Sequence, residues 1–182
     1  METREPGGTP AAEQIRQLLL ETQGDASPSL LPWCEAYLVL AARTQHVAQV
    51  IRPALRRGAI VVCDRFVDST LAYQGYGRGL PVALLRKLNA LATGGVSPDL
   101  TLLFDLPVGV GLARRRKGRL EETRIDRESQ RFHERVRRGF LALAKRDRGR
   151  IRVIDAGRPP EAVAEQVRQV VARALTRKRS RD

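Results

Sequence analysis

The chain has 182 residues, 42% of them hydrophobic and 4% aromatic, a composition that suits one folded domain with a mostly aliphatic core and excludes a disordered polymer. No apolar run approaches the length of a membrane span, and the first residues do not have the pattern of a secretory signal. The net charge of +13, from 33 Lys and Arg against 20 Asp and Glu, is compatible with an anionic partner and with a general surface charge.

Two helices are expected in the first third of the chain. The pattern of residues 9–22 predicts a helix in which Thr9 caps the amino end and Pro10 suits the first turn. A longer helix is expected at residues 33–57, where apolar side chains keep the helical interval. We expect Pro53 to kink this helix, because proline has no backbone N–H and its ring clashes with the preceding turn.

Three short, continuous segments rich in aliphatic residues predict strands buried on both faces. They are residues 59–63, 100–106 and 151–156. Helical patterns separate and follow them, at residues 81–93, 108–117, 124–145 and 160–177. Strands that alternate with helices indicate an α/β fold with a parallel sheet covered on both faces. We expect a single domain over residues 1–182, with a frayed basic tail at residues 176–182.

Neither the cysteines nor the histidines have the spacing of a metal site. Cys34 and Cys63 lie far apart, so we expect two buried, reduced thiols of the kind found in cytosolic proteins. His46 and His133 are equally isolated, and we expect no metal-binding or catalytic role for either.

Polar clusters follow the expected strands at residues 4–8, 64–66 and 155–157. In parallel sheets, ligands bind at the carboxyl ends of the strands. The third cluster fits an ordinary polar loop. The first two predict a binding site, because a charged pair just after a buried strand is costly unless it is used.

Four motifs occur in order along the chain: TREPGGTP, CDRFVDSTLAYQGYGRGL, SPDLTLLFDLPVGVGLARRR and RIDRESQRFHERVRRGFLALA. In this register the sequence resembles bacterial thymidylate kinases from residue 3 to about residue 173. The resemblance implies a P-loop NTPase-like, three-layer α/β/α fold with a parallel sheet. It also implies a cytoplasmic enzyme of dTTP synthesis that transfers the γ-phosphoryl group of ATP to dTMP, with Mg²⁺, to give dTDP. Such enzymes are usually homodimers, and the helix at residues 33–57 is the expected contact surface.

The resemblance assigns the phosphate end of the site to the first two polar clusters. Arg65 is expected to grip the dTMP phosphate, and Asp64 to lie near Mg²⁺ or its waters. Glu5 and Pro6 match a wall of the dTMP pocket. Arg16, on the helix after them, aligns with an arginine that contacts the monophosphate.

The base end of the site is assigned to two other segments. Arg43 matches an arginine that donates to the thymine O4, which is a pure acceptor. Thr70 and Gln74 match positions that line the base, and Tyr73 one that packs against the deoxyribose. Val39 departs from the family, which usually has an aromatic residue there to stack on thymine, so base affinity is expected to be weaker.

The lid of the family aligns with about residues 114–123, where a run of arginines can close over ATP and stabilise charge in the transition state. The candidates are Arg114, Arg115, Arg116 and Arg119, and the sequence does not choose among them. Arg124 begins the helix expected after the lid. Phe140 stands where many members have tyrosine.

The phosphate loop of the family, G-x-x-x-x-G-K-[ST], is absent from the 182 residues. We therefore expect about 30 residues, one strand-loop-helix unit, to be missing ahead of Met1, through a start site assigned too far downstream or a truncated gene. The missing strand belongs at the centre of the sheet, so unpaired strand edges and exposed aliphatic faces are expected. The chain as written is then expected to be poorly soluble and inactive.

Two alternatives stay open at the level of the sequence. One is a degenerate, non-catalytic relic that still binds nucleotide through Arg43 and Arg65. The other is a basic nucleic-acid-binding protein, which no recognisable groove-reading motif supports.

Overall fold

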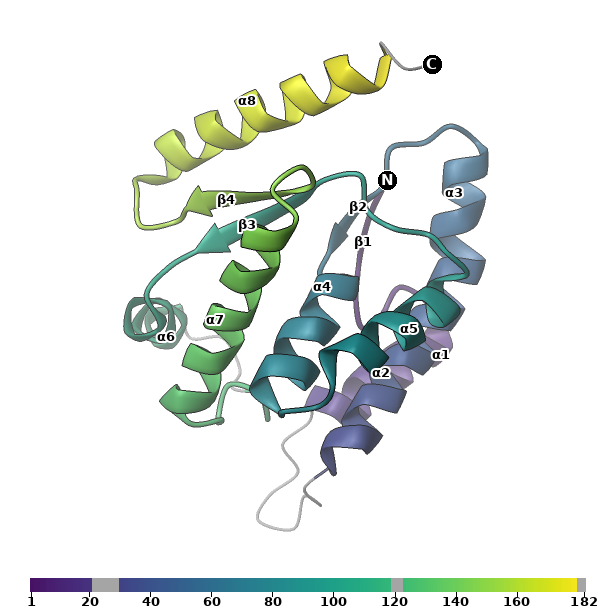
Figure 1. The fold of residues 1–182 in the computed structure, drawn as a ribbon, viewed down its shortest axis with the longest axis vertical. Coiled ribbons are helices and arrows are strands. Elements are labelled where there is room, and N and C mark those ends of the chain that lie inside the picture. The colour runs from purple at the N-terminus through teal and green to yellow at the C-terminus, as the bar shows by residue number, and fades with distance from the viewer. Residues whose placement is uncertain (21–29, 119–122, 180–182) are drawn as a thin grey trace. The chain divides into compact units, whose positions relative to one another are not determined.

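A computed structural model describes residues 1–20, 30–118 and 123–179 of the chain. Helices and strands alternate along it (Figure 1). In chain order they are β1 (Glu2–Arg4), α1 (Pro10–Leu20), α2 (Pro32–His46), η1 (Val47–Ile51), α3 (Arg52–Arg56), β2 (Val62–Asp64), α4 (Val67–Thr70), η2 (Leu71–Gly77), α5 (Val82–Thr93), β3 (Thr101–Asp105), α6 (Val108–Lys117), α7 (Gln130–Arg146), β4 (Ile151–Asp155) and α8 (Pro160–Arg179), where η denotes a π-helical segment. None of the helices in these ranges has the length and hydropathy needed to span a bilayer.

The strands form two parallel pairs. β1 pairs with β2, with Thr3 opposite Cys63, and β3 pairs with β4, with Leu103 opposite Val153. Parallel neighbours need a crossover connection, and helices supply it in both pairs. The alternation of parallel strands with helices confirms the α/β class predicted from the sequence.

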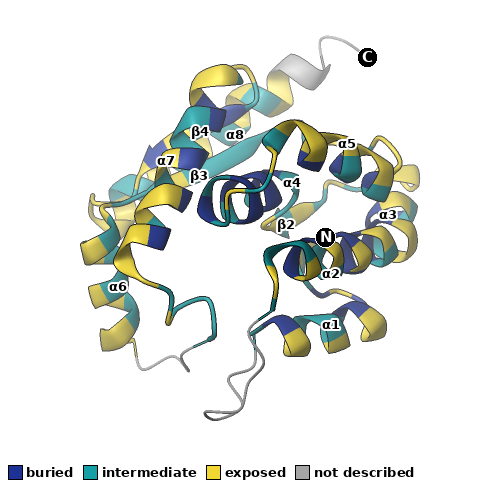
Figure 2. Cartoon of the chain, turned by 60° about the horizontal axis from the view of Figure 1, so that its bottom comes forward, coloured by how far each residue is buried: buried dark blue, intermediate teal, exposed yellow. Residues whose placement is uncertain are grey.

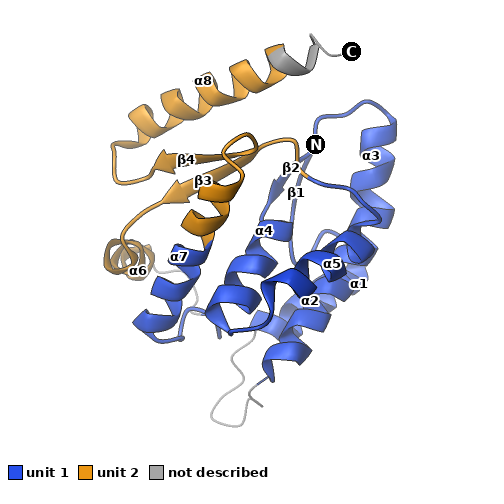
Figure 3. Cartoon of the chain, in the orientation of Figure 1, with its two compact units in different colours: residues 1–97, 120–139 blue, residues 98–119, 140–182 orange. Residues whose placement is uncertain are grey.

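The chain forms two compact units (Figure 3). The first comprises residues 1–97 and 120–139, and the second residues 98–119 and 140–182. The first unit holds β1, β2 and the helices from α1 to α5. The second holds β3, β4, α6 and α8, and α7 begins in the first unit and ends in the second. The sequence predicted one domain and gave no sign of this division.

The prediction that residues 59–63 form a strand buried on both faces is wrong. Ile60 is 63% exposed and Val62 60% exposed, and the strand itself covers only Val62–Asp64. Among the described residues β2 has a single partner strand, so one edge and much of its aliphatic surface stay uncovered. In the other pair, Phe104 is 53% and Val153 43% exposed. These values agree with the exposed strand faces expected from the sequence.

The long helix expected at residues 33–57 forms as α2, η1 and α3, and a π-helical turn lies just before Pro53. The backbone N–H of Arg52 donates to the carbonyl of Val47, five residues back, so the chain widens into the π-helical turn η1 just before the proline. Because Pro53 has no N–H to donate one turn back, the wider turn precedes the position where the regular hydrogen bond is lost.

Other helix boundaries follow local signals closely. The Thr9 hydroxyl accepts a hydrogen bond from the N–H of Ala12 at 3.2 Å, which confirms the predicted cap of α1. Gly94 ends α5 in the left-handed conformation that favours glycine. Two boundaries differ from prediction: α7 begins at Gln130 and not at residue 124, and α8 continues to Arg179, into the tail expected to be frayed.

The sequence analysis missed the helix formed by α4 and η2, which follows the Asp64-Arg65 pair. It is dark blue along most of its length in Figure 2, and its buried residues include both apolar and polar side chains. π-helical turns such as η2 are frequent at functional sites.

Candidate functional site

The Arg43 side chain is only 1% exposed, although arginine is rarely buried unless it is paired. Its Nε donates to Glu5 at 2.8 Å, and its Nη1 donates to Thr70 at 2.7 Å and to the Asn89 side-chain oxygen at 2.6 Å. The Phe66 ring lies under the guanidinium, with its centroid 5.4 Å from Cζ. Three of the five guanidinium hydrogens are therefore held by groups from the loop after β1, from α4 and from α5.

Arg43 Nη2 is the remaining nitrogen. No hydrogen-bond partner for it occurs among residues 1–20, 30–118 and 123–179. It is also not one of the fully buried side-chain atoms that lack a partner in those ranges, so it keeps some access to solvent. Nη2 is therefore the one nitrogen of the Arg43 guanidinium without a hydrogen-bond partner among the described residues.

The Glu5 carboxylate, 3% exposed, joins two side chains of α2 to the loop that follows β1. One oxygen accepts from Arg43, and the other lies 3.0 Å from Nδ1 of His46. His46 Nε2 lies 2.6 Å from the Thr3 hydroxyl. Gly8 packs on the same ring, because a Cβ on this glycine would lie 2.6 Å from Cδ2 of His46. Glu5 thus orients Arg43 and His46, and its place in the wall of the dTMP pocket stays a prediction.

A second buried carboxylate, Glu35, organises the neighbouring part of α2. It accepts from Nε2 of Gln74 at 2.8 Å, from Arg78 at 2.9 and 3.2 Å, and from Arg124 at 2.7 Å. Burial alone raises the pKa of the Glu35 carboxyl, but these hydrogen bonds outweigh it, and the pKa lies below its ordinary value. Because Glu35 holds the amide nitrogen of Gln74 through one of its two N–H groups, the orientation of the amide is set, and its carbonyl oxygen is the group that can accept from a ligand.

The Asp64-Arg65 pair lies at the end of β2. Arg65 adopts a φ of +64°, a left-handed conformation that costs a non-glycine residue free energy and often marks a functional turn. Its Nη1 donates to the Tyr73 hydroxyl at 3.1 Å, and its Cζ lies 5.2 Å from the centre of the Tyr73 ring. The hydroxyl of Tyr73 raises the pKa of the Arg65 guanidinium, which keeps it protonated. Both Asp64 and Arg65 are exposed.

Arg16 and Pro6 also meet, since Arg16 Nη1 donates to the Pro6 carbonyl at 2.9 Å. This contact ties α1 to the loop after β1. Asp64 ends β2 and Arg65 follows it, whereas Arg16 lies on α1, the helix that follows the loop after β1. The first unit therefore combines cations suited to a phosphate with an open donor suited to a base.

No group of three or more His, Cys, Asp or Glu side chains that could hold a metal ion occurs among the described residues. The protein side chains there do not form a metal cage of their own. The exposed carboxylate of Asp64 has the hard oxygen that Mg²⁺ prefers.

The comparisons with known proteins decide the family. The model of the family described as thymidylate kinase matches residues 1–167. The thymidylate kinase of Thermomicrobium roseum is 55% identical over 177 residues, which cover 97% of this chain and 82% of that protein. The thymidylate kinase of Desulfovibrio desulfuricans is 52% identical over 182 residues, with the same two coverages. The chain belongs to the thymidylate kinase family.

The fold agrees with this membership. A crystal structure of thymidylate kinase from Ehrlichia chaffeensis matches with a TM-score of 0.72 and 35% sequence identity, over 94% of this chain and 79% of that one. The similarity confirms the P-loop NTPase-like α/β class that the resemblance implied, and membership makes the chain a kinase by family.

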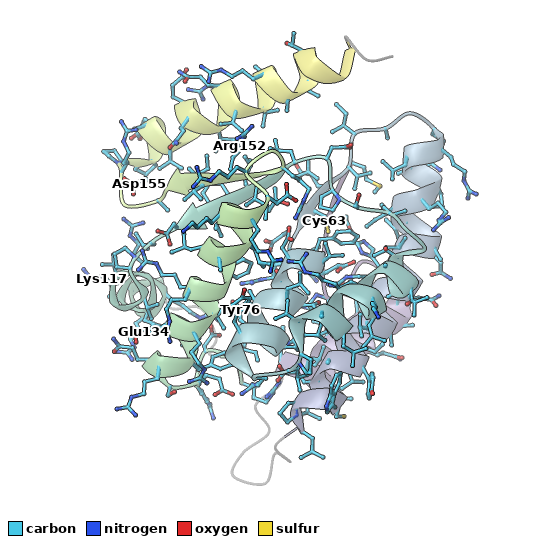
Figure 4. All side chains as sticks on the ribbon, viewed as in Figure 1. Cys63, Tyr76, Lys117, Glu134, Arg152 and Asp155 are labelled. Atoms are coloured by element: carbon cyan, nitrogen blue, oxygen red, sulfur yellow. The ribbon has the colours of Figure 1, made fainter. Side chains whose placement is uncertain are left out.

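The arginines predicted for the thymidylate kinase lid belong to the second unit. Arg114, Arg115 and Arg116 lie in the last turns of α6, beside Lys117, which Figure 4 labels. Arg114 Nη1 donates to the backbone carbonyl of Ala156 at 2.8 Å, in the polar loop after β4. This loop is closed by a hydrogen bond from the N–H of Gly157 to Asp155, which fits its interpretation as an ordinary turn. Arg119 lies outside the described residues.

Two expectations about single side chains need comment. Val39 is half-buried on α2, one turn before Arg43, in the position where family members usually have an aromatic residue. The prediction of two buried thiols is wrong for Cys34, which is exposed on α2. Cys63, labelled in Figure 4, is half-buried on β2, and burial is the main cause that raises its thiol pKa to about 12.

The sequence analysis did not identify the residues that hold the site together. They are Glu35, His46, Arg78 and Asn89. One signal could have found some of them: Glu35, Arg43 and His46 recur at about helical spacing along a mostly apolar helix, so they share one face of α2. A polar stripe on an otherwise apolar helix indicates buried polar contacts.

Proposed function

We propose that the first unit binds dTMP and presents its phosphate for transfer of the γ-phosphoryl group from ATP, giving dTDP. One pair of observations carries the proposal. Arg43 Nη2 is a fixed donor, and the Gln74 carbonyl oxygen is an acceptor whose amide partner is already used. The thymine edge presents O4 as an acceptor and N3–H as a donor, whereas cytosine presents the reverse pattern.

The phosphate end follows from two cations, the exposed Arg65 and the half-buried Arg16. Arg65 and Arg16 supply guanidinium groups suited to a dianionic phosphate, because planar N–H pairs match phosphate oxygens. Tyr73, held by its hydrogen bond with Arg65, occupies the position that the family uses against the deoxyribose. The nucleotide that receives the phosphoryl group, dTMP, is thus recognised at its base and at its phosphate.

The donor is ATP, as in the family, with Mg²⁺ as its counter-ion. Asp64 fits an ion that is held mostly by phosphate oxygens and water, since Mg²⁺ in kinases is commonly bound through one or two carboxylates plus substrate phosphates. The ion neutralises phosphate charge when bound. The arginines of α6 are proposed to stabilise the same phosphate charge from the lid, as arginines do in phosphoryl transfer.

A second copy of the chain is the proposed partner, through the exposed side of α2. Tyr37 is 58% exposed and stacks on Trp33 with ring centroids 5.7 Å apart, and Leu31 before the helix is 73% exposed. Sedimentation velocity should give a dimer for the wild-type chain and a monomer for Tyr37→Glu. The two free cysteines suit the cytoplasm, where thiols stay reduced.

Binding tests this function directly, because the 182 residues contain no G-x-x-x-x-G-K-[ST] loop for ATP. Calorimetric titration with dTMP, dCMP and thymidine should show dTMP bound at least about tenfold more tightly than either competitor. Equal affinity for dTMP and dCMP would contradict the base assignment, and equal affinity for dTMP and thymidine would contradict the phosphate assignment. Strongly salt-dependent DNA binding without nucleotide preference would support the nucleic-acid alternative.

A further inference from the structure

Asn89, in the middle of α5, is 4% exposed and uses both halves of its amide. Its Oδ1 accepts from Nη1 of Arg43 at 2.6 Å, and its Nδ2 donates to the backbone carbonyl of Val67 at 3.1 Å. The guanidinium can only donate and the carbonyl can only accept, so only one orientation of the amide satisfies both partners. The side chain is therefore locked.

The two partners of Asn89 belong to the two ends of the proposed site. Arg43 lies at the base end. Val67 begins α4, directly after the segment that carries Asp64, Arg65 and Phe66. The amide thus links the base-reading arginine to the turn that carries the phosphate-binding pair, and the Phe66 ring lies against the same guanidinium.

Asn89 also decides which Arg43 hydrogens remain for a ligand. Glu5 holds Nε, and Thr70 with Asn89 holds both hydrogens of Nη1. Without the Asn89 oxygen, one Nη1 hydrogen is released, and the guanidinium can turn to share other acceptors. Nη2 then no longer has one fixed direction.

We propose that Asn89 is a positioning residue for nucleobase recognition: it fixes Arg43 so that Nη2 is the donor that meets the O4 of a thymine base. The inference rests on the function proposed above. Asn89 acts through Arg43, and its carbonyl and amide serve separate purposes. The carbonyl oxygen of Asn89 holds Arg43 so that Nη2 is the donor for the base, and the amide N–H stabilises the start of α4.

The test measures the ratio of dTMP to dCMP affinity by calorimetric titration of the full chain and two variants, beside thermal unfolding of each. Asn89→Ala should weaken dTMP binding about tenfold and bring the ratio close to one, because a hydrogen bond to a charged group is lost. Asn89→Asp keeps an acceptor for Arg43 but not the donor to Val67. It should unfold at a lower temperature and still prefer dTMP.

Arg52→Ala is the matched control. Arg52 Nη2 donates to the carbonyls of Thr93 and Gly94 at 3.0 and 3.3 Å, so it braces the same helix α5 without touching Arg43. It should lower thermal stability and leave the affinity ratio within about twofold of wild type.

A folded Asn89→Ala variant with an unchanged ratio would overturn the inference, as would loss of the ratio in Arg52→Ala. If Asn89→Ala does not fold, the Asn89→Asp variant tests the inference instead. A preserved preference for dTMP over dCMP supports the positioning role, and a lost preference overturns it. A wild-type chain with no preference for dTMP overturns the proposed function itself, which separates the two failures.

Discussion

The two ends of the dTMP site proposed for the first unit are built on opposite principles. At the base end, Arg43 is 1% exposed and three of its hydrogens are committed to side chains from three other elements. At the phosphate end, Asp64 and Arg65 are exposed, on a turn whose φ of +64° is unfavourable for arginine. One end is rigid and paired before a ligand arrives, and the other is open.

The difference follows from what each end must recognise. A neutral base offers only a few hydrogen-bonding groups, so discrimination depends on donors and acceptors that cannot reorient. A phosphate carries charge on oxygens that point in several directions, so exposed arginines can bind it with little loss of binding free energy even when their orientation is not fixed. The following changes test whether stability belongs to the base end and ligand affinity to the phosphate end.

The largest loss of stability is expected for Glu5→Ala. Removing this carboxylate leaves Arg43 as a buried, uncompensated charge, which costs about 3–5 kcal/mol in the free energy of unfolding. Urea titration measures it. Glu13→Ala is the control, since Glu13 pairs with Arg4 at the surface and its loss should cost about 1 kcal/mol or less. Similar losses in the two variants would contradict the difference between buried and exposed charge.

At the phosphate end, Arg65→Ala and Arg65→Gly should each reduce dTMP affinity about 10- to 100-fold and leave thymidine affinity unchanged. Their stabilities should differ. Glycine tolerates the left-handed turn, so Arg65→Gly should be about 1 kcal/mol more stable than Arg65→Ala. Equal thermal midpoints would show that the turn relaxes when the arginine is removed.

The pH dependence of the free energy of unfolding should reveal the contribution of Glu35 and its hydrogen-bond donors. Hydrogen bonds from Arg78, Arg124 and Gln74 lower the pKa of Glu35 in the folded chain despite its burial. A carboxyl with a lowered folded pKa contributes stability above its unfolded pKa and loses it as pH falls. The stability advantage of wild type over Glu35→Gln should therefore shrink between about pH 6 and pH 3. A constant difference across this range would contradict the lowered pKa.

The smallest expected effect concerns Val39. Replacing it with phenylalanine adds a ring one turn before Arg43, where stacking on a base is worth about 0.5–1.5 kcal/mol. We expect dTMP to bind roughly 2- to 10-fold more tightly to Val39→Phe in calorimetry. Val39→Ile, which adds volume without a ring, should leave the affinity nearly unchanged. A similar gain in both variants would assign the effect to packing.

The sequence by itself determined the α/β class, the family and most of the strands and helices, although not β1 or the helix formed by α4 and η2. Local rules are short-range, so the helix cap at Thr9, the glycine stop at Gly94 and the bounds of α6 could be predicted from neighbouring residues. The motif residues Arg43, Arg65 and Gln74 were identified as candidates through the resemblance to bacterial thymidylate kinases. The residue type and its position within the motif indicate the chemistry of each candidate.

The tertiary structure decided how those candidates are held. Glu5, Thr70 and Asn89 reach Arg43 across 38, 27 and 46 residues of chain, and Arg124 reaches Glu35 across 89. No local periodicity encodes such partners, because they meet only when separate elements pack. The exposed faces of Ile60 and Val62 depend on which strands pair with β2. The aliphatic run alone predicted burial on both faces, and only the absence of the phosphate-loop motif led us to expect exposed strand faces.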